Sequence, residues 1–142
     1  MSQAPTDQTY ETPDTTSEST RRKRLILFVA VDPAEDPAPL RTAMFWASVA
    51  AEAGLEAEVR LAANAVRALQ PGHVADSEVA ALLEQGPPSG VVVSVCPRAM
   101  GNFDIGEDAV RAIGGRPRTL AEILTEVAEG RSVLIPITHG ID

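Results

Sequence analysis

The sequence predicts an α/β fold: a single three-layer domain in which a mostly parallel sheet of four to five strands has helices on both faces. Three observations support this prediction. Short apolar runs alternate along the chain with longer segments of helical pattern. The apolar runs are continuous, which is typical of parallel strands that are buried on both faces. Glycine and proline separate most of these segments and mark the turns between them.

Two strands and a long helix are predicted in the first part of the chain. Residues 25–31 are a continuous apolar run and give the first strand. A helix is expected over residues 38–53, because Asp36 can cap its start and Gly54 can end it. Residues 58–61 give a short second strand.

The middle of the chain supplies a further helix and the most apolar strand. Residues 62–69 are expected to form a short helix or an irregular turn, which a Pro-Gly pair ends. Asp76 is predicted to cap the next helix. Residues 91–95 read Val-Val-Val-Ser-Val and give a buried strand, which Cys96 and the proline after it break.

The last part of the chain is predicted to contain two helices and a final strand. Residues 105–113 are expected to be helical in part. Thr119 and Glu122 have the spacing of a capping box for a second helix. The final strand covers residues 133–137, and its proline indicates an edge strand or a strand end. The apolar residues at the spacing of one helix face are Leu120, Ile123, Leu124 and Val127.

The two ends of the chain differ from the domain between them. Residues 1–20 contain no Val, Ile, Leu, Phe or Trp, and nine of the twenty are Ser or Thr. Such a composition cannot bury enough apolar surface to offset the entropy of folding. Residues 1–24 are therefore expected to be a disordered polar tail with a basic end. The predicted domain spans residues 25–138, and residues 139–142 form a short C-terminal tail.

The charge of the chain lies in the predicted domain. The formal net charge is -8. Residues 1–24 contain four acidic and four basic side chains, so they contribute none of it. An acidic domain repels phosphate backbones, which makes nucleic acid an unexpected partner. The basic run at residues 21–24 is interpreted as a solvated hinge beside the first strand.

Cys96 is the only cysteine of the chain, so no internal disulfide can form. A free thiol is typical of a reducing compartment, and a cytoplasmic location is expected. No apolar stretch is long enough to span a membrane. Paired-cysteine metal spacing and glycine-rich nucleotide motifs are absent from the sequence. The sequence therefore predicts no cofactor, no metal and no membrane partner.

Cys96 is the candidate centre of any chemistry, because it comes directly after a buried strand. Ligands of parallel sheets bind outside the carboxyl ends of the strands. Asp32 and Asn64 follow the first two strands, so all three side chains are predicted to share one edge of the sheet. Arg98 is two residues beyond the thiol, and positive charge favours a reactive thiolate.

The residues around the thiol also include two that shape the backbone. Gly101 lets the chain turn closely around the sulfur, whereas Pro97 removes a backbone donor. The alternative interpretation is a buried cysteine that only fills space. His73 and His139 are interpreted as loop or tail residues rather than bases, and a Cys-His pair would have to arise through the fold.

Three stretches of the chain resemble a known family. They read RLILFVAVDPAEDPAPLRTAMFWASVAAEAGLEAEVRLAANAV, VVVSVCPRAMGNFDIGEDAV and GGRPRTLAEILTEVAEGRSVLIPI. In their order and spacing they look like the opening, the strand-Cys-loop segment and the closing helix and strand of the DsrE/DsrF-like, TusD-related family. The resemblance covers about residues 25–137.

The resemblance implies a function and an assembly. In sulfur-relay members of the family, the cysteine after this strand accepts a persulfide and passes the sulfur on, and that role would fall on Cys96. Arg98 would then help to hold the anion. The resemblance further implies a trimer or hexamer and a protein that donates or accepts sulfur. Some relatives have a second cysteine three residues later, where this chain has Ala99, so an internal resolving cysteine is excluded.

Two other functions remain open from the sequence. The first is a non-catalytic module that binds a small molecule or a protein through its sheet edge or helix faces. Its function would survive the substitution Cys96→Ser. The second is a thiol redox sensor or peroxidase, in which the same cysteine is oxidised to a sulfenic acid and needs an external reductant.

Overall fold

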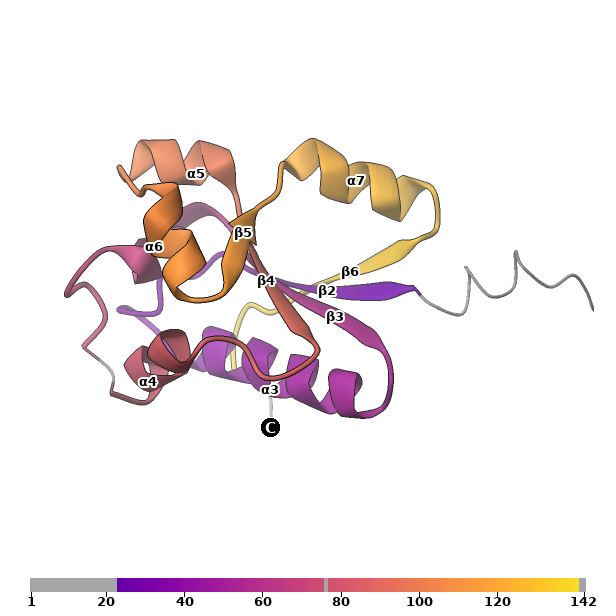
Figure 1. The fold of residues 1–142 in the computed structure, drawn as a ribbon, viewed down its shortest axis with the longest axis horizontal. Helices are drawn as coiled ribbons and strands as arrows, with labels where there is room; N and C mark the ends of the chain where they lie inside the picture. Colours follow the sequence, from indigo (N-terminus) through magenta and orange to yellow (C-terminus); the bar gives the residue numbers. More distant parts are fainter. Residues whose placement is uncertain (1–22, 76, 141–142) are drawn as a thin grey trace, which may run out of the picture.

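The computed structural model describes residues 23–75 and 77–140 and places five parallel strands in one central sheet (Figure 1). The order of the strands across the sheet is β5-β4-β3-β2-β6. The strands are β2 (Arg24–Val29), β3 (Glu56–Leu61), β4 (Val91–Val95), β5 (Gly115–Pro117) and β6 (Ser132–Pro136). Every neighbouring pair is parallel, so the predicted α/β class is confirmed.

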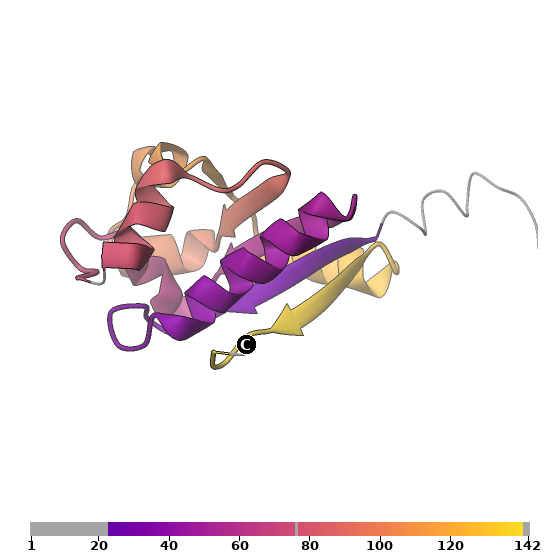
Figure 2. The same cartoon turned by 90° about the horizontal axis from the view of Figure 1, so that it is seen from below.

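Helices lie on both faces of this sheet and complete the three layers. The helical segments are α3 (Ala38–Glu52), η1 (Ala63–Leu69), α4 (Ser77–Gln85), α5 (Pro97–Asn102), α6 (Glu107–Ala112) and α7 (Leu120–Ala128). Figures 1 and 2 show α3 and α4 on one side of the sheet and α5 and α7 on the other. None of the helices in the described part is long and apolar enough to cross a membrane.

The two faces of the sheet differ in chemistry, and β3 shows why. Its side chains alternate, with Ala57, Val59 and Leu61 in the apolar core that α3 covers. Glu58 and Arg60 point to the opposite face and are nevertheless buried. The α3 side is therefore an ordinary apolar core, whereas the α7 side contains charged groups.

The apolar core contains aliphatic side chains from the three central strands and from α3. Isoleucine, valine, leucine and alanine dominate it, as the low aromatic content requires. Residues from these four elements include Leu27, Val29, Leu40, Ala43, Ala47, Val59, Leu61, Val93 and Val95. Continuous apolar strands are expected where both faces of a parallel sheet are covered.

Two elements differ from the sequence prediction. Helix α5 begins directly after Cys96, where only the end of a strand was expected, because Pro97 occupies a first helical position that needs no backbone donor. Strand β5 is only three residues long and pairs with β4 through Gly115, where a Gly-Gly loop was expected. The predicted tail over residues 1–22 and the Asp76 cap lie outside the described residues.

The three central strands end at the same level. Val29, Leu61 and Val95 are register partners across β2, β3 and β4. The segments that follow these strands therefore emerge at one edge of the sheet, here called the carboxyl edge. This geometry brings Cys96 next to the segments that follow β2 and β3.

Candidate functional site

Cys96 is held at the carboxyl edge by the main chain on both sides of it. Its N–H donates to the carbonyl oxygen of Leu61 at 3.2 Å, which continues the ladder between β3 and β4. Its own carbonyl accepts from the N–H of Met100 at 3.0 Å and starts α5. The cysteine is free. At the end of this buried strand, it is therefore fixed in position by its main chain and is partly exposed as a residue.

Glu58 is the centre of the buried charged face behind this edge. It is 0% exposed. The hydroxyl of Ser94 donates to its Oε2 at 2.6 Å, and Nε of Arg118 donates to the same oxygen at 3.2 Å. A terminal nitrogen of Arg24 pairs with its Oε1 at 3.1 Å. Both oxygens of the carboxylate are therefore engaged, by side chains from β2, from β4 and from the residue after β5.

Arg118 joins Glu58 to helix α7. Its guanidinium makes two contacts with Glu126, at 2.7 and 3.2 Å, and it also pairs with Oε1 of Glu58 at 3.2 Å. Hydrogen bonds from Arg118, assisted by one from Ser132, lower the pKa of Glu126 to about 2 against the opposing effect of burial. The bond to Glu126 in turn raises the pKa of Arg118.

Arg60 lies between this charged face and the cysteine. It is 1% exposed, and it faces Ser94 in the register between β3 and β4. One terminal nitrogen donates to the carbonyl oxygen of Arg118 at 2.5 Å. Nε has no hydrogen-bond partner among the described residues. Burial lowers the pKa of Arg60, whereas Cys96 and Glu58 oppose that shift. The N–H of Cys96 donates to the carbonyl oxygen of Leu61, the residue after Arg60, so Arg60 and Cys96 lie on adjoining segments of the sheet.

The residues that the sequence placed around the thiol have different surroundings. Arg98, Pro97 and Gly101 lie on α5 and are exposed. Asn64 lies in η1 and is exposed as well. In the ranges that the structure describes, no hydrogen bond or ion pair joins these side chains to Cys96. Sequence reasoning did not select the buried Arg60, because no local pattern links it to a cysteine 36 positions later.

Asp32 is buried and belongs to a second cluster at the carboxyl edge. It is 3% exposed and accepts the N–H of Ala34 at 2.9 Å. Nε2 of His73 lies 2.8 Å from one of its oxygens and 3.0 Å from the other. Arg67 is 3.7 Å from the same carboxylate, and its guanidinium lies over the ring of Phe103. His73 is therefore a partly buried partner of Asp32 and not the solvated loop residue that the sequence suggested.

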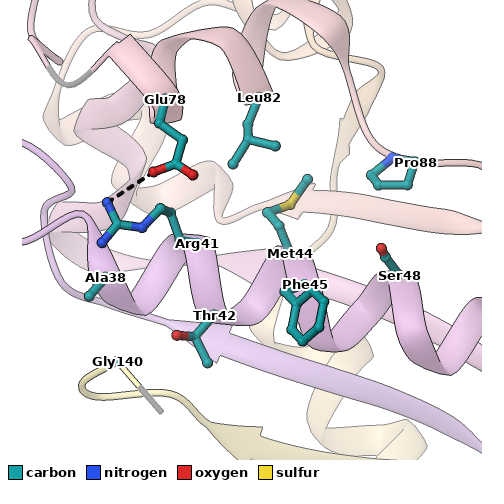
Figure 3. A pocket seen from close by; sticks show the side chains of 10 residues that line it. All are labelled: Ala38, Arg41, Thr42, Met44, Phe45, Ser48, Glu78, Leu82, Pro88 and Gly140. Atoms are coloured by element: carbon teal, nitrogen blue, oxygen red, sulfur yellow. Dashed lines mark ion pairs between the residues drawn. The ribbon is translucent and has the colours of Figure 1, made fainter. Parts of the chain in front are cut away.

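A cavity of about 650 Å³ lies on the other side of the sheet, between α3, α4 and the chain near Gly140 (Figure 3). Met44, Phe45 and Leu82 give it apolar walls, and Arg41 pairs with Glu78 at 3.5 Å at one end. The residues around Cys96 do not line this cavity. Within the described ranges, no three His, Cys, Asp or Glu side chains come together as a metal site.

Comparison with known proteins identifies the fold and nothing further. No family model and no curated protein matches the chain. A conserved protein of unknown function from Bacteroides thetaiotaomicron, BT1422, is similar in structure at a TM-score of 0.60 and 18% identity, over 83% of this chain and 97% of that one. The ychN protein from E. coli gives a TM-score of 0.58 and 13% identity, over 80% and 98% of the two chains.

A third similar structure comes from an archaeon. It is a protein of unknown function from Methanobacterium thermoautotrophicum, MTH1491, with a TM-score of 0.59 and 16% identity over 80% of this chain and 98% of that one. Each of the three proteins is matched over almost its whole length. The chain therefore has an α/β fold that also occurs in these three proteins.

Proposed function

We propose that this protein is a sulfur carrier of the DsrE/DsrF-like type and that Cys96 bears the sulfur as a persulfide. One observation above all supports the proposal: a partly exposed cysteine lies at the carboxyl edge of a parallel sheet, directly after the strand that pairs with the strand of the buried Arg60. Reactive cysteines need a nearby positive charge and access to reagents. The fold supports the same family assignment without establishing it.

The proposed reaction transfers one sulfane sulfur atom from a donor persulfide to Cys96 and then to an acceptor thiol. The Cys96 thiolate attacks the outer sulfur of a donor persulfide, so that a new S–S bond forms on Cys96 while the S–S bond of the donor breaks. The donor thiolate leaves with the electron pair and takes a proton from water. An acceptor thiolate later attacks the outer sulfur on Cys96 in the same manner. Neither step needs an oxidant or a cofactor.

Intact-protein mass spectrometry tests this proposal directly. Wild type and Cys96→Ser are incubated with a small persulfide donor, desalted and weighed. Wild type is expected to gain one sulfur atom, and the variant is expected to gain none. Two oxygen atoms add nearly the same mass as one sulfur atom, so each sample is also treated with dithiothreitol. Only a persulfide returns to the starting mass, because sulfinic acid resists this reductant.

The same measurement decides between the proposal and its alternatives. A wild-type thiol that is alkylated readily but gains no sulfur would contradict the sulfur carrier. A non-catalytic binding module would then be favoured, and the apolar cavity beside α3 gives that candidate some support. Gain of a single oxygen atom with peroxide, without sulfur loading, would instead indicate a redox sensor.

We also propose that the carrier works as a homo-oligomer, a trimer or a hexamer, in the cytoplasm. Leu120 and Leu124 on α7 are 48% and 49% exposed, and Phe45 on α3 is 66% exposed. Large apolar side chains in such positions are typical of surfaces that contact another subunit. A donor or acceptor protein would then approach the carboxyl edge, where the thiol is open.

A further inference from the structure

Arg60 is a buried cation that lacks a carboxylate partner. The guanidinium is 1% exposed, and in the part of the chain that the structure describes no carboxylate lies within ion-pair distance of it. Glu58 is the carboxylate on the same strand face, but Ser94, Arg118 and Arg24 occupy both of its oxygens. Arg60 therefore interacts with Glu58 only at longer range.

Nε of Arg60 is a buried donor without an acceptor among the described residues. A terminal nitrogen donates to the carbonyl oxygen of Arg118. A buried donor without an acceptor is unfavourable, and a buried charge without a counter-charge is more so. The guanidinium is consequently stabilised by any negative charge that enters its surroundings. Cys96 is the nearby reactive group, because Arg60 is the register partner of Ser94, two residues before it. The N–H of Cys96 also donates to the carbonyl oxygen of Leu61, the residue after Arg60.

The surrounding structure keeps Arg60 in this position. Its acceptor is the main chain of Arg118, and the Arg118 side chain is fixed by two contacts with Glu126 and two with Glu58. Strand β3 fixes the other end, because Arg60 pairs with Ser94 in the register of the sheet. The charge is thus held beside the sulfur before any ligand arrives, which avoids a cost of ordering.

We propose that Cys96 and Arg60 form an anion-selective thiol site, in which Arg60 holds a negative charge on or directly next to the sulfur. The ligands of this site are small anionic sulfur compounds and the anionic outer sulfur of a persulfide on Cys96. That the bound anion is a sulfur compound rests on the proposed function, whereas the preference for anions does not. The exposed Arg98, which the sequence favoured for this role, is not the residue that holds the charge.

Two alkylating reagents of similar size and different charge test the selectivity. Iodoacetate carries a carboxylate, whereas iodoacetamide is neutral, and both react with the same thiolate. The ratio of their rate constants therefore reports the local charge and is independent of how much of the thiol is ionised. The ratio is measured at high salt, which screens distant charges more than close ones. Glutathione gives the reference ratio.

The native wild-type protein is expected to prefer iodoacetate more than glutathione does. The net charge of -8 opposes this preference, so it would have to come from a cation close to the sulfur. Arg60→Met is expected to lower the ratio at least about fivefold, and Arg60→Lys to keep it within about twofold of wild type. Arg98→Met tests the residue that the sequence favoured and is expected to leave the ratio unchanged. Arg116→Met, which changes an exposed arginine on β5, is the matched control.

Two results would overturn the inference. One is a native wild-type ratio at or below that of glutathione, which needs no variant and so does not depend on the folding of Arg60→Met. The other is a folded Arg60→Met protein with an unchanged ratio. Sulfur loading is recorded in the same variants. If the protein prefers iodoacetate but gains no sulfur, the anion site is supported and the sulfur carrier is contradicted. If it gains sulfur but shows no preference for iodoacetate, the sulfur carrier is supported and the role of Arg60 is contradicted.

Discussion

Glu58 shows how a single buried carboxylate can organise a protein interior. Its oxygens accept from Ser94 on β4, from Arg118 after β5 and from Arg24 on β2. A buried charge is tolerated only when such partners replace the lost water. Glu58 thus makes this face of the sheet ionic rather than hydrophobic, and it links Arg24 and Arg118 through one shared carboxylate.

Removing the charge of Glu58 is expected to destabilise the fold strongly. The substitution Glu58→Gln keeps the shape but leaves Arg118 and Arg24 without their shared counter-charge, at a cost of about 3–5 kcal/mol in the free energy of unfolding. Urea denaturation followed by circular dichroism measures this cost. The control is Glu56→Gln on the same strand, because Glu56 is largely exposed and its pair with Arg24 contributes less than about 1 kcal/mol. Equal effects of the two substitutions would contradict this account.

Some residues of the site could be predicted from the sequence, and others could not. Cys96 follows a strand whose composition is unmistakable, so its place at the carboxyl edge could be derived from the sequence. Arg60 could not be assigned in this way, because its partners Arg118 and Cys96 lie on other segments and meet it only when β3, β4 and β5 align. The pair of Asp32 and His73 escaped prediction for the same reason, since 41 positions separate them.

Helix α7 has a well-specified start and an incompletely covered surface. Thr119 accepts from the N–H of Glu122, and Glu122 accepts from the N–H of Thr119, which confirms the predicted capping box. Of its apolar face, Ile123 is fully buried, whereas Leu120 and Leu124 are about half exposed. The helix is therefore positioned by its cap, by Ile123 and by the Glu126–Arg118 contact more than by a wide apolar interface.

The exposed leucines of α7 lead to a prediction about assembly. If they contact another subunit, Leu124→Glu is expected to dissociate the oligomer, because it buries a charge in an apolar interface. Light scattering coupled to size-exclusion chromatography measures the mass at several protein concentrations. Thr125→Glu is the control, since it adds the same charge at an exposed neighbouring position. A wild-type protein that is monomeric at tens of micromolar would contradict the assembly.

Elements were predictable where their signals were local. The long helix α3 and the strand β4 follow from their apolar patterns, and α7 follows from its pattern and its capping box. The prediction that Asp36 is the N-cap of α3 is wrong, because Pro37 occupies the N-cap position and no side-chain hydrogen bond caps the helix from that position. Strand β5 is too short to give a pattern and exists because β4 offers a free edge for pairing. Helix α5 begins at a proline that, in the sequence, indicated a break, although proline also suits the first helical turn.

At the scale of the whole molecule, the charged face of the sheet makes the free energy of unfolding depend on pH in the acid range. The pKa of Glu126 is lowered from 4.5 to about 2 by Arg118 and Ser132. A carboxyl group with a lowered pKa stabilises the fold fully above its unfolded pKa and loses this effect as the pH falls through its folded pKa. The contribution is about 3 kcal/mol at neutral pH and disappears between about pH 4.5 and pH 2.

The corresponding experiment compares unfolding free energies in urea from neutral pH down to pH 2 for wild type and Glu126→Gln. Wild type is expected to lose stability steeply below about pH 4.5. The variant is expected to start lower at neutral pH and to fall less over the same range, so that the two curves converge in acid. Parallel curves would show that Glu126 does not account for the acid sensitivity.

The prolines at the ends of β5 and β6 limit how this protein can meet another one. These are the two edge strands of the sheet, and they end at Pro117 and Pro136 respectively. Proline lacks the N–H that an added strand would need, so another chain finds no complete ladder at either border near the thiol. If the protein is a sulfur carrier as proposed, a protein partner would approach along the strand axes and make its contacts through loops and side chains. Recognition of that kind would depend on shape and charge, and the complex could dissociate once the sulfur had been transferred.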